Sequence, residues 1–419
     1  MTAAGLTVGV ETAPPRRGGR PGRWRWYLVG AFVAFAVVAL VRVFTGADDL
    51  TSRGTVAAAL TAAVPIAMAG LGALWAERAG VVNIGLEGMM VLGTWGAGFA
   101  GYQWGPWAGV VFGLALGALG GLLHAIATVT FGVDHIISGV AINLLAPGAA
   151  LFLSKQYFTD APGGGQKQSP PLRDVPHITV PGISSWLRSL EEQHWWLVSD
   201  LAGVLGGLVT EVSLLTVIAA LLLVGTLYVL WRTPFGLRLR ACGEAPVAAE
   251  SLGVNVYKYK YAAVIMSGAL AGLGGAFLAI SSSQFREGQT GGRGFIGLAA
   301  MIFGNWRPGG LAAGAGLFGY TDAMQLRGSD AVHALLLLLG IALLTLAVVQ
   351  FLARRVTIAV TAAVLGVAFG GWYFVTDELP PELVGAAPYV VTLLVLALAA
   401  QRLRMPKADG QIYRRGEAG

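Results

Sequence analysis

The chain has 419 residues, of which 55% are hydrophobic and only 12% are charged. Because soluble domains carry about 25% charged residues, this composition excludes a soluble protein and predicts an all-α polytopic membrane protein. The formal net charge of +6 bears on orientation in the lipid bilayer rather than on nucleic acid, since Arg and Lys collect in cytoplasmic loops. The single cysteine, Cys242, excludes an intramolecular disulfide.

The chain begins with a polar segment and continues with apolar ones. Residues 1–26 combine several prolines and arginines and predict a disordered basic tail on the cytoplasmic side. Residues 27–415 are expected to form the membrane domain.

Apolar runs close to the length of a membrane helix, about 20 residues, recur along the chain. They predict ten to twelve crossings, with both termini on one side. The runs lie at 27–44, 54–75, 80–101, 107–129, 135–153, 211–231, 258–280, 293–305, 309–326, 332–350, 356–375 and 386–403. The Arg and Lys residues of the loops place both termini in the cytoplasm. We therefore expect a cytoplasmic loop at 232–257 and an external, Pro/Gly-rich loop at 154–200.

Two of these runs are interrupted. The run 80–101 contains Asn83, Glu87 and several glycines, and the run 293–305 is too short to cross as a straight helix. Each follows a long helix rich in small residues and precedes a Gly-rich helix, and the two long helices run in opposite directions. This pattern predicts an inverted-topology repeat, 54–153 against 258–350. Interrupted spans at matching positions of two halves indicate a transport path.

The carboxylate of Glu87 has two interpretations of similar weight. A charged side chain at the centre of a lipid-facing helix costs about 2.5–3.5 kcal/mol, so we expect Glu87 to face the protein interior, a watery cavity or the membrane edge. It then either lines the permeation path with Asn83 or is a buried acceptor that caps the free amides of a broken helix.

The cytoplasmic loop contains a predicted short helix at 245–252. Pro246 suits the first turn of a helix, and Gly253 suits the position just past its end, where a left-handed conformation turns the chain. Glu244 is expected at the start of this helix, and Glu250 near its end. The spacing alone favours an ordinary connecting loop over a docking element for a soluble partner.

Motifs for chemistry are sparse. The segment 163–169 lacks the spacing of a phosphate-binding loop, and the histidines are scattered without ligand spacing. Asp134 and His135 are expected to cap a helix. We therefore expect no catalytic residue, no metal and no cofactor, so the chain is predicted not to be an enzyme.

Four segments resemble the nucleoside-type permease subunit of bacterial ABC importers, a family related to the ribose and branched-chain amino acid permeases. They are ERAGVVNIGLEGMM (77–90), DHIISGVAINLL (134–145), GLRLRACGEAPVAAESLGVNV (236–256) and GGRGFIGLAAMIFGNWRPGG (291–310). The C-terminal stretch 388–413 is also similar.

The resemblance implies a multi-pass protein of the bacterial plasma (inner) membrane. Its partners would be a cytoplasmic ATP-binding subunit, an external substrate-binding lipoprotein, and a second homologous permease or a second copy of this chain. It also makes 242–253, with Glu244, Pro246, Glu250 and Gly253, similar to the coupling helix that docks on the ATPase. Glu250 is then expected to pair with an Arg or Lys of that partner. The segment 331–376 departs from the family and is expected to be an added helical hairpin.

The predicted function is inward transport of a nucleoside or a related small solute. The alternatives are a permease of the same type for a sugar or an amino acid, an ion-coupled secondary transporter, and a membrane scaffold without transport. The polar residues of the second interrupted region are expected near the outer mouth and the path; they are Ser281, Ser282, Gln284, Thr290, Arg293 and Asn305. The candidate residues of the substrate path are Asn83, Glu87, Ser138, Asn143, Ser281, Gln284, Thr290, Arg293 and Asn305.

Overall fold

The computed structural model describes residues 23–377, 379–380, 383–386, 390 and 403–416. The predicted basic tail therefore lies outside the described residues except for 23–26, where a helix has already begun. The predicted last span, 386–403, also lies almost entirely outside them.

The described residues form a polytopic, all-helical membrane protein apart from one two-stranded ribbon. Within these residues, seven helices are long and apolar enough to cross a membrane. These are α2 (Arg53–Arg78), α4 with the π turn that follows it (Pro106–Thr130), α5 (His135–Tyr157), α8 (Leu214–Arg232), α11 (Val256–Ser281), α14 (Ser329–Leu352) and α15 (Val356–Val375). Four more helices lie on predicted spans: α1 (Arg23–Thr45), α3 (Leu86–Trp104), α12 (Arg293–Phe303) and α13 (Pro308–Gln325).

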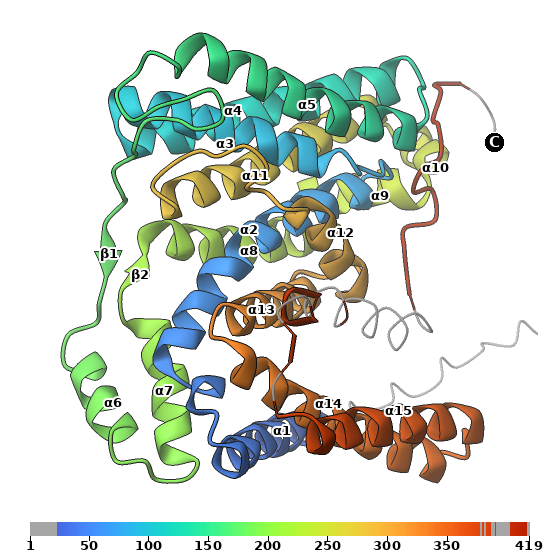
Figure 1. Cartoon of the computed structure of the whole chain (residues 1–419). Helices are drawn as coiled ribbons and strands as arrows, with labels where there is room; N and C mark the ends of the chain where they lie inside the picture. Colours follow the sequence, from blue (N-terminus) through green and yellow to red (C-terminus); the bar gives the residue numbers. More distant parts are fainter. Residues whose placement is uncertain (1–22, 378, 381–382, 387–389, 391–402, 417–419) are drawn as a thin grey trace, which may run out of the picture.

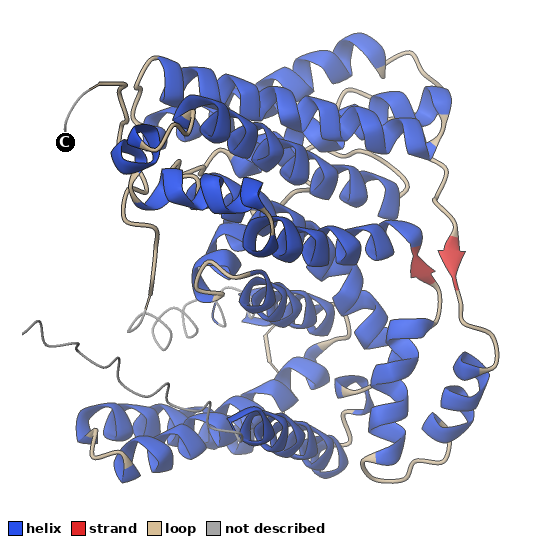
Figure 2. Ribbon diagram, turned by 180° about the vertical axis from the view of Figure 1, so that it is seen from behind, coloured by secondary structure: helices blue, strands red, loops and turns tan. Residues whose placement is uncertain are grey.

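The helices are arranged in layers (Figure 1). Helices α3, α4, α5 and α11 lie together at one side of the molecule, and α1, α14 and α15 lie at the other side. Helix α2 crosses between them, with α12 and α13 beside it; the view from behind shows the same layers (Figure 2). The interior of the molecule is therefore built on α2 and α11.

Glycines allow the two central helices to approach their neighbours closely. Helices α3 and α4 pack on α11, whereas α12 and α13 pack on α2, and α2 and α11 pack on each other. A Cβ atom on Gly272 of α11 would lie 2.4 Å from the carbonyl oxygen of Gly113 on α4, and one on Gly319 of α13 would lie 2.4 Å from that of Ala59 on α2. Small residues are the usual contact surface of membrane helices because they let backbones approach.

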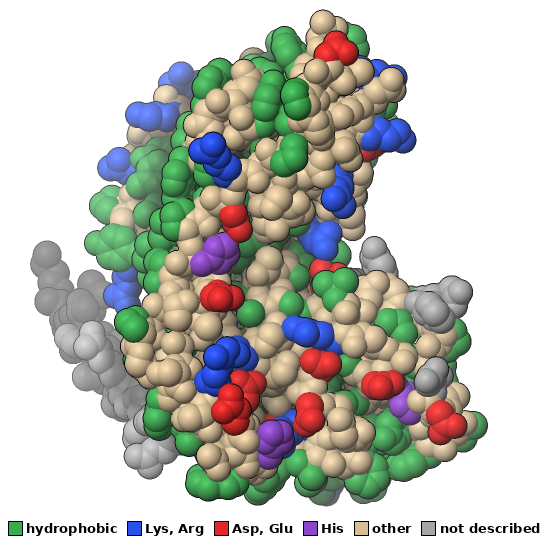
Figure 3. Space-filling view, turned by 60° about the vertical axis from the view of Figure 1, so that its left-hand side comes forward, with side chains coloured by type: hydrophobic (Ala, Val, Ile, Leu, Met, Phe, Trp, Pro, Cys, Tyr) green, Lys and Arg blue, Asp and Glu red, His purple; other side chains and the backbone are tan. Residues whose placement is uncertain are grey.

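One end of the molecule carries a small polar layer, which we call the α7 end. There β1 (His177–Ile178) pairs antiparallel with β2 (Val212–Ser213), next to α6 (Ile183–Glu191) and α7 (Val198–Val209). Acidic, basic and histidine side chains are interspersed on this face (Figure 3). The segment 154–200, predicted as a loop, thus contains α6 and the first residues of α7.

The α7 end is fastened to the membrane helices by a buried carboxylate. Asp200 on α7 forms an ion pair with Arg42 of α1 (3.1 Å) and accepts a hydrogen bond from the hydroxyl of Thr51 (2.5 Å). Thr51 directly follows the short 3₁₀ helix η1 (Asp48–Leu50). Helix α1 is thereby fixed to the start of α2.

The opposite end, which we call the α10 end, carries two short helices, α9 (Pro234–Glu244) and α10 (Pro246–Ser251).

Helices α14 and α15 form a hairpin over the range 331–376 where the sequence predicts one. They pack on each other, and a Cβ on Gly340 would lie 3.1 Å from the carbonyl oxygen of Gly366.

Candidate functional site

The break between α2 and α3 is held in place by Asn83. This residue is fully buried. Its amide Nδ2 donates to the hydroxyl of Ser267 on α11 (2.9 Å), and its Oδ1 accepts from the backbone N–H of Gly85 (3.0 Å). Asn83 therefore fixes the non-helical segment 79–85 against α11, and it does not line the cavity described below.

Helix α5 holds the same break from a second side. Oδ1 of Asn143 accepts from the backbone N–H of Gly88 (2.7 Å), and its Nδ2 donates to the carbonyl oxygen of Ile84 (2.7 Å). The hydroxyl of Ser138 on the same helix lies 2.8 Å from Nδ1 of His124 on α4. Nε2 of His124 lies 3.0 Å from the carbonyl oxygen of Val82 in the break.

His124 is not among the residues predicted from the sequence. The signal that could have found it is an ionisable residue inside an apolar membrane helix, which is rare without a role or a partner.

Glu87 caps the N-terminus of the second interrupted helix. Its Oε1 accepts from the backbone N–H of Gly292 (2.9 Å), and its Oε2 accepts from that of Gly294 (2.7 Å). The first amides of a helix have no partner within the helix, and a carboxylate also suits the positive end of the helix dipole. The interpretation of Glu87 as an acceptor for a broken helix is confirmed, and the helix that it caps is α12.

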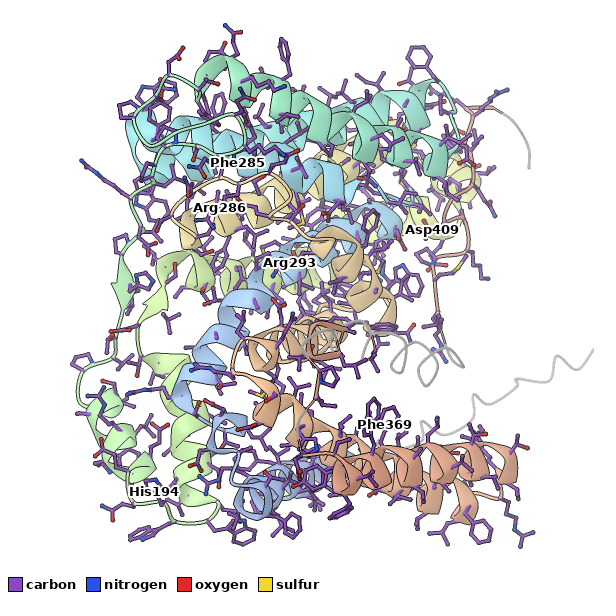
Figure 4. All side chains as sticks on the ribbon, in the orientation of Figure 1. His194, Phe285, Arg286, Arg293, Phe369 and Asp409 are labelled. Atoms are coloured by element: carbon purple, nitrogen blue, oxygen red, sulfur yellow. The ribbon has the colours of Figure 1, made fainter. Side chains whose placement is uncertain are left out.

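Glu87 also lines a cavity of about 260 Å³ between α3, α5 and the loop that joins α11 to α12. Thr290 and Phe285 of that loop line it with Thr94 of α3 and Pro147 of α5. Figure 4 labels Phe285 and the neighbouring Arg286 on the loop. The cavity brings together two of the predicted path residues, Glu87 and Thr290.

Arg293, in the first turn of α12, is paired within the protein. Its Nη2 forms an ion pair with the carboxylate of Asp322 on α13 (2.8 Å), and its Nη1 lies 3.4 Å from the carbonyl oxygens of Gln289 and Thr290. Arg293 and Asp322 line a second cavity, of about 230 Å³, with Ile66 of α2.

Three predicted path residues lie elsewhere. Ser281 is exposed at the end of α11, and the side-chain amide of Gln284 donates to the carbonyl oxygen of Ser169 in the loop after α5 (2.9 Å). Asn305 follows α12 at the α10 end, where its Oδ1 accepts from the backbone N–H of Arg404 (2.8 Å). The expectation that Asn305 lies near the same mouth as Thr290 is wrong, because α12 carries the chain to the opposite end of the molecule.

The predicted short helix is present as α10. Pro246 occupies its first position, and Gly253, just past its end, has a φ of +81°, the left-handed conformation expected of it. The prediction that Glu244 lies at the start of this helix is wrong. Glu244 is the last residue of α9, because α9 extends past Ala241 and the chain turns only at Ala245.

Glu250 has partners within its own chain. Its Oε2 accepts from the hydroxyl of Tyr413 (2.5 Å), and its Oε1 lies 3.1 Å from Nε of Arg415. The hydrogen bond from Tyr413 lowers the pKa of the Glu250 carboxyl. The expectation that Glu250 needs a basic residue of another subunit is therefore wrong: the basic residue comes from the C-terminal segment of the same chain.

A cationic cavity of about 820 Å³ lies next to α9 and α10. Its charged lining residues are Arg78, Arg240, Arg307, Arg404, Lys407 and Glu244. Two of the guanidinium groups, those of Arg78 and Arg240, lie 5.4 and 5.5 Å from the ring of Trp231. The excess of positive charge at this surface suits an acidic partner.

A family described as the branched-chain amino acid transport system, permease component, matches residues 55–346. No solved structure matches the chain.

Three relatives match the chain over almost their whole length. The nucleoside ABC transporter permease protein NupC of Lactococcus lactis subsp. cremoris is 34% identical, over 85% of this chain and 96% of its own. The guanosine ABC transporter permease protein NupQ of Bacillus subtilis is 35% identical, over 86% of this chain and 97% of its own. The putative glucose ABC transporter permease protein TsgC13 of Haloferax volcanii is 32% identical, over 87% of this chain and 98% of its own.

Proposed function

Since the chain belongs to the family of permease components of the branched-chain amino acid transport system, we propose that it is the membrane-spanning subunit of an ABC importer for nucleosides. The observation that carries the proposal is the similarity to NupC and NupQ, which extends over 85% and 86% of this chain. As a permease component the chain is a transport subunit, and ATP hydrolysis belongs to a separate protein.

An inverted-topology repeat is the proposed architecture of the transport core. Helices α2, α3 and α4 correspond to α11, α12 and α13. The packing supports this pairing, because α3 and α4 lie on α11 while their counterparts α12 and α13 lie on α2. Each first helix is followed by a non-helical segment, 79–85 or 282–292. Non-helical backbone at membrane depth is tolerated only where protein or a cavity surrounds it.

The cavity lined by Glu87 and Thr290 is the proposed outer part of the substrate path. Its lining combines apolar side chains with a few polar groups, the mixture that small-molecule sites use. Both carboxylate oxygens of Glu87 already accept backbone N–H groups, and the other charged lining residues include the ion pair of Lys167 with Glu287. The acidic and basic side chains of the lining balance, so a neutral solute held by hydrogen bonds suits this cavity better than an ion. We assign Asn83, Ser138 and Asn143 to the support of the path rather than to its lining.

The ATP-binding subunit is proposed to dock at the α10 end. Helix α10 is short and mostly exposed, and the neighbouring cationic cavity offers charge for an acidic surface. The external substrate-binding lipoprotein would meet the α7 end, and a second permease, homologous or identical, would complete the membrane part.

This assignment makes both termini cytoplasmic in the bacterial plasma membrane, with ten to twelve crossings. Residues 1–26 are then a basic tail, and residues 27–415 are the permease domain. Within that domain, 154–200 is an external segment, 232–257 is a cytoplasmic loop, and 331–376 is a hairpin added to the family's usual helices.

A sugar is the second candidate substrate, because TsgC13 is named as a putative glucose permease. Competition for uptake separates the two. In cells that express the chain with its partner subunits, unlabelled nucleosides should suppress the uptake of labelled guanosine, whereas glucose in equal excess should not. Suppression by glucose alone would make the sugar the substrate.

A further inference from the structure

The C-terminal segment 403–416 crosses the α10 end of the molecule and contacts several elements that are far apart in sequence (Figure 1). Its backbone is bonded to α9, since the N–H of Ala408 donates to the carbonyl oxygen of Gly243 (2.9 Å). The N–H of Lys407 lies 3.4 Å from the carboxylate of Glu244, where α9 ends. The segment is therefore tied to the link between α9 and α10.

Asp409 connects the same segment to the end of α2 (Figure 4). Its carboxyl faces the carboxyl of Glu77, which is 4% exposed. Glu77 also accepts from the indole N–H of Trp306 (2.6 Å), in the turn between α12 and α13. The stretch 405–409 thus lies against the end of α2, where Glu77 also holds the turn that follows α12.

Tyr413 connects the segment to α10 and α11. Its ring packs on Tyr257 (5.6 Å between centroids), and the ammonium group of Lys260 lies 5.9 Å from its centre. Its hydroxyl donates to Glu250 (2.5 Å), which Arg415 also contacts. Tyr413 further belongs to the apolar cluster that buries Ala249, the residue through which α10 enters the protein interior.

We propose that the segment 403–416 is a positioning element for ATP-driven transport, which makes α10 and the inner ends of α2 and α12 move as one body. The inference rests on the proposed function, because it assumes that α10 receives the movement of the ATPase. Helix α10 has only six residues and is followed by Gly253 in a left-handed turn. Ala249 is the one residue of this helix that is buried, so the contacts of the segment with Glu250 and with Gly243 at the end of α9 supply the rigid connection that a moving helix needs.

The test uses the full chain, assembled with its ATPase and binding protein in lipid vesicles. Tyr413→Phe removes the bond to Glu250 but keeps the ring packing, and Glu250→Gln removes the charge from the same bond. We expect each variant to fold and to hydrolyse ATP, but to take up at least about threefold less solute per ATP, because the hydrogen bond to a charged group is removed in the first and loses its charge in the second. The double variant should be no worse than Glu250→Gln alone, because that change already weakens the contacts of residue 250 with both Tyr413 and Arg415.

Tyr228→Phe is the matched control, because Tyr228 is 63% exposed on α8 and the change removes the same hydroxyl far from the segment. Wild-type uptake per ATP in both single variants would overturn the proposal, and so would losses that add fully in the double variant. A failure of the proposed function would be seen separately, as wild-type protein that takes up no nucleoside with ATP.

Discussion

Glu87 shows how one side chain can serve both the fold and a transport path. It leaves the first turn of α3 and satisfies two backbone amides of α12, so the two interrupted helices meet through a carboxylate. A Cβ on Gly294 would lie 2.6 Å from Cα of Glu87, which explains why the sequence has glycine at the point of contact. The same carboxylate faces the cavity.

Replacing Glu87 by Gln tests this role. A glutamine has one acceptor oxygen in place of two, so one amide of α12 loses its partner. We expect Glu87→Gln to lower the free energy of unfolding by about 1–3 kcal/mol and to reduce uptake. Thermal unfolding of the purified protein and uptake in vesicles measure the two effects. Glu192→Gln, at an exposed position, is the control. If the two variants have the same stability and the same uptake, Glu87 has neither the capping role nor the transport role.

Asp409 predicts a dependence on pH. Burial raises the pKa of its carboxyl to about 7, whereas a free aspartate titrates near about 4. Because the docked segment holds the proton more tightly than the free segment, docking should weaken as the pH rises from about 4 to about 7. The charged groups that face Asp409 are Glu77 and Arg78 of α2 and Lys260 of α11.

Hydrogen exchange of 403–416 measures this docking. We expect faster exchange at pH 8 than at pH 5.5, after correction for the intrinsic rate, and Asp409→Asn should abolish the difference. Asp160→Asn, exposed after α5, should leave it unchanged. A pH effect that survives in Asp409→Asn would assign the titration to another group.

At the scale of the elements, the sequence specifies best those segments whose ends carry strong local signals. Pro246 and Gly253 bound α10 because one fits a first helical turn and the other a left-handed end. The two interrupted spans are visible because polar residues and glycines break an apolar run. Helix α7 was not predicted, because its 12 residues are too few for a membrane span. The partners of Glu87 and Glu250 lie far away in the sequence, and no local pattern identifies such contacts.

Gly253→Val tests the end of α10. Valine disfavours the φ of +81° found there, so the chain should turn back at a different angle and α10 should present another face. We expect the variant to insert normally but to bind the ATPase more weakly in a pull-down of the assembled complex. Gly316→Val is the control, since nothing lies within 4 Å of a Cβ there. Equal binding of the ATPase by both variants would make 232–257 only a connector.

At the scale of the whole molecule, the two ends of the helices have different chemistry. The α10 end carries the cationic cavity, and the α7 end carries mixed charges. The native cysteine cannot report on this sidedness, since Cys242 is fully buried and burial raises the pKa of its thiol to about 11. Exposed positions are therefore needed for labelling.

The orientation can be measured with single cysteines in a Cys242→Ala background. Arg173→Cys at the α7 end should react with an impermeant thiol reagent added to intact cells, whereas Ser251→Cys on α10 should react only after the membrane is opened. Both positions are exposed in the structure. The reverse pattern would invert the proposed topology.

The most direct test of the central claim is the energy source of transport. The chain should be reconstituted with its ATPase and its binding protein, and the uptake of labelled guanosine into the vesicles measured with ATP on the side that the ATPase faces. We predict uptake that requires ATP, stops when ATP is replaced by a non-hydrolysable analogue, and persists when ion gradients are collapsed. Uptake that follows an ion gradient without ATP would contradict the account and identify a secondary transporter.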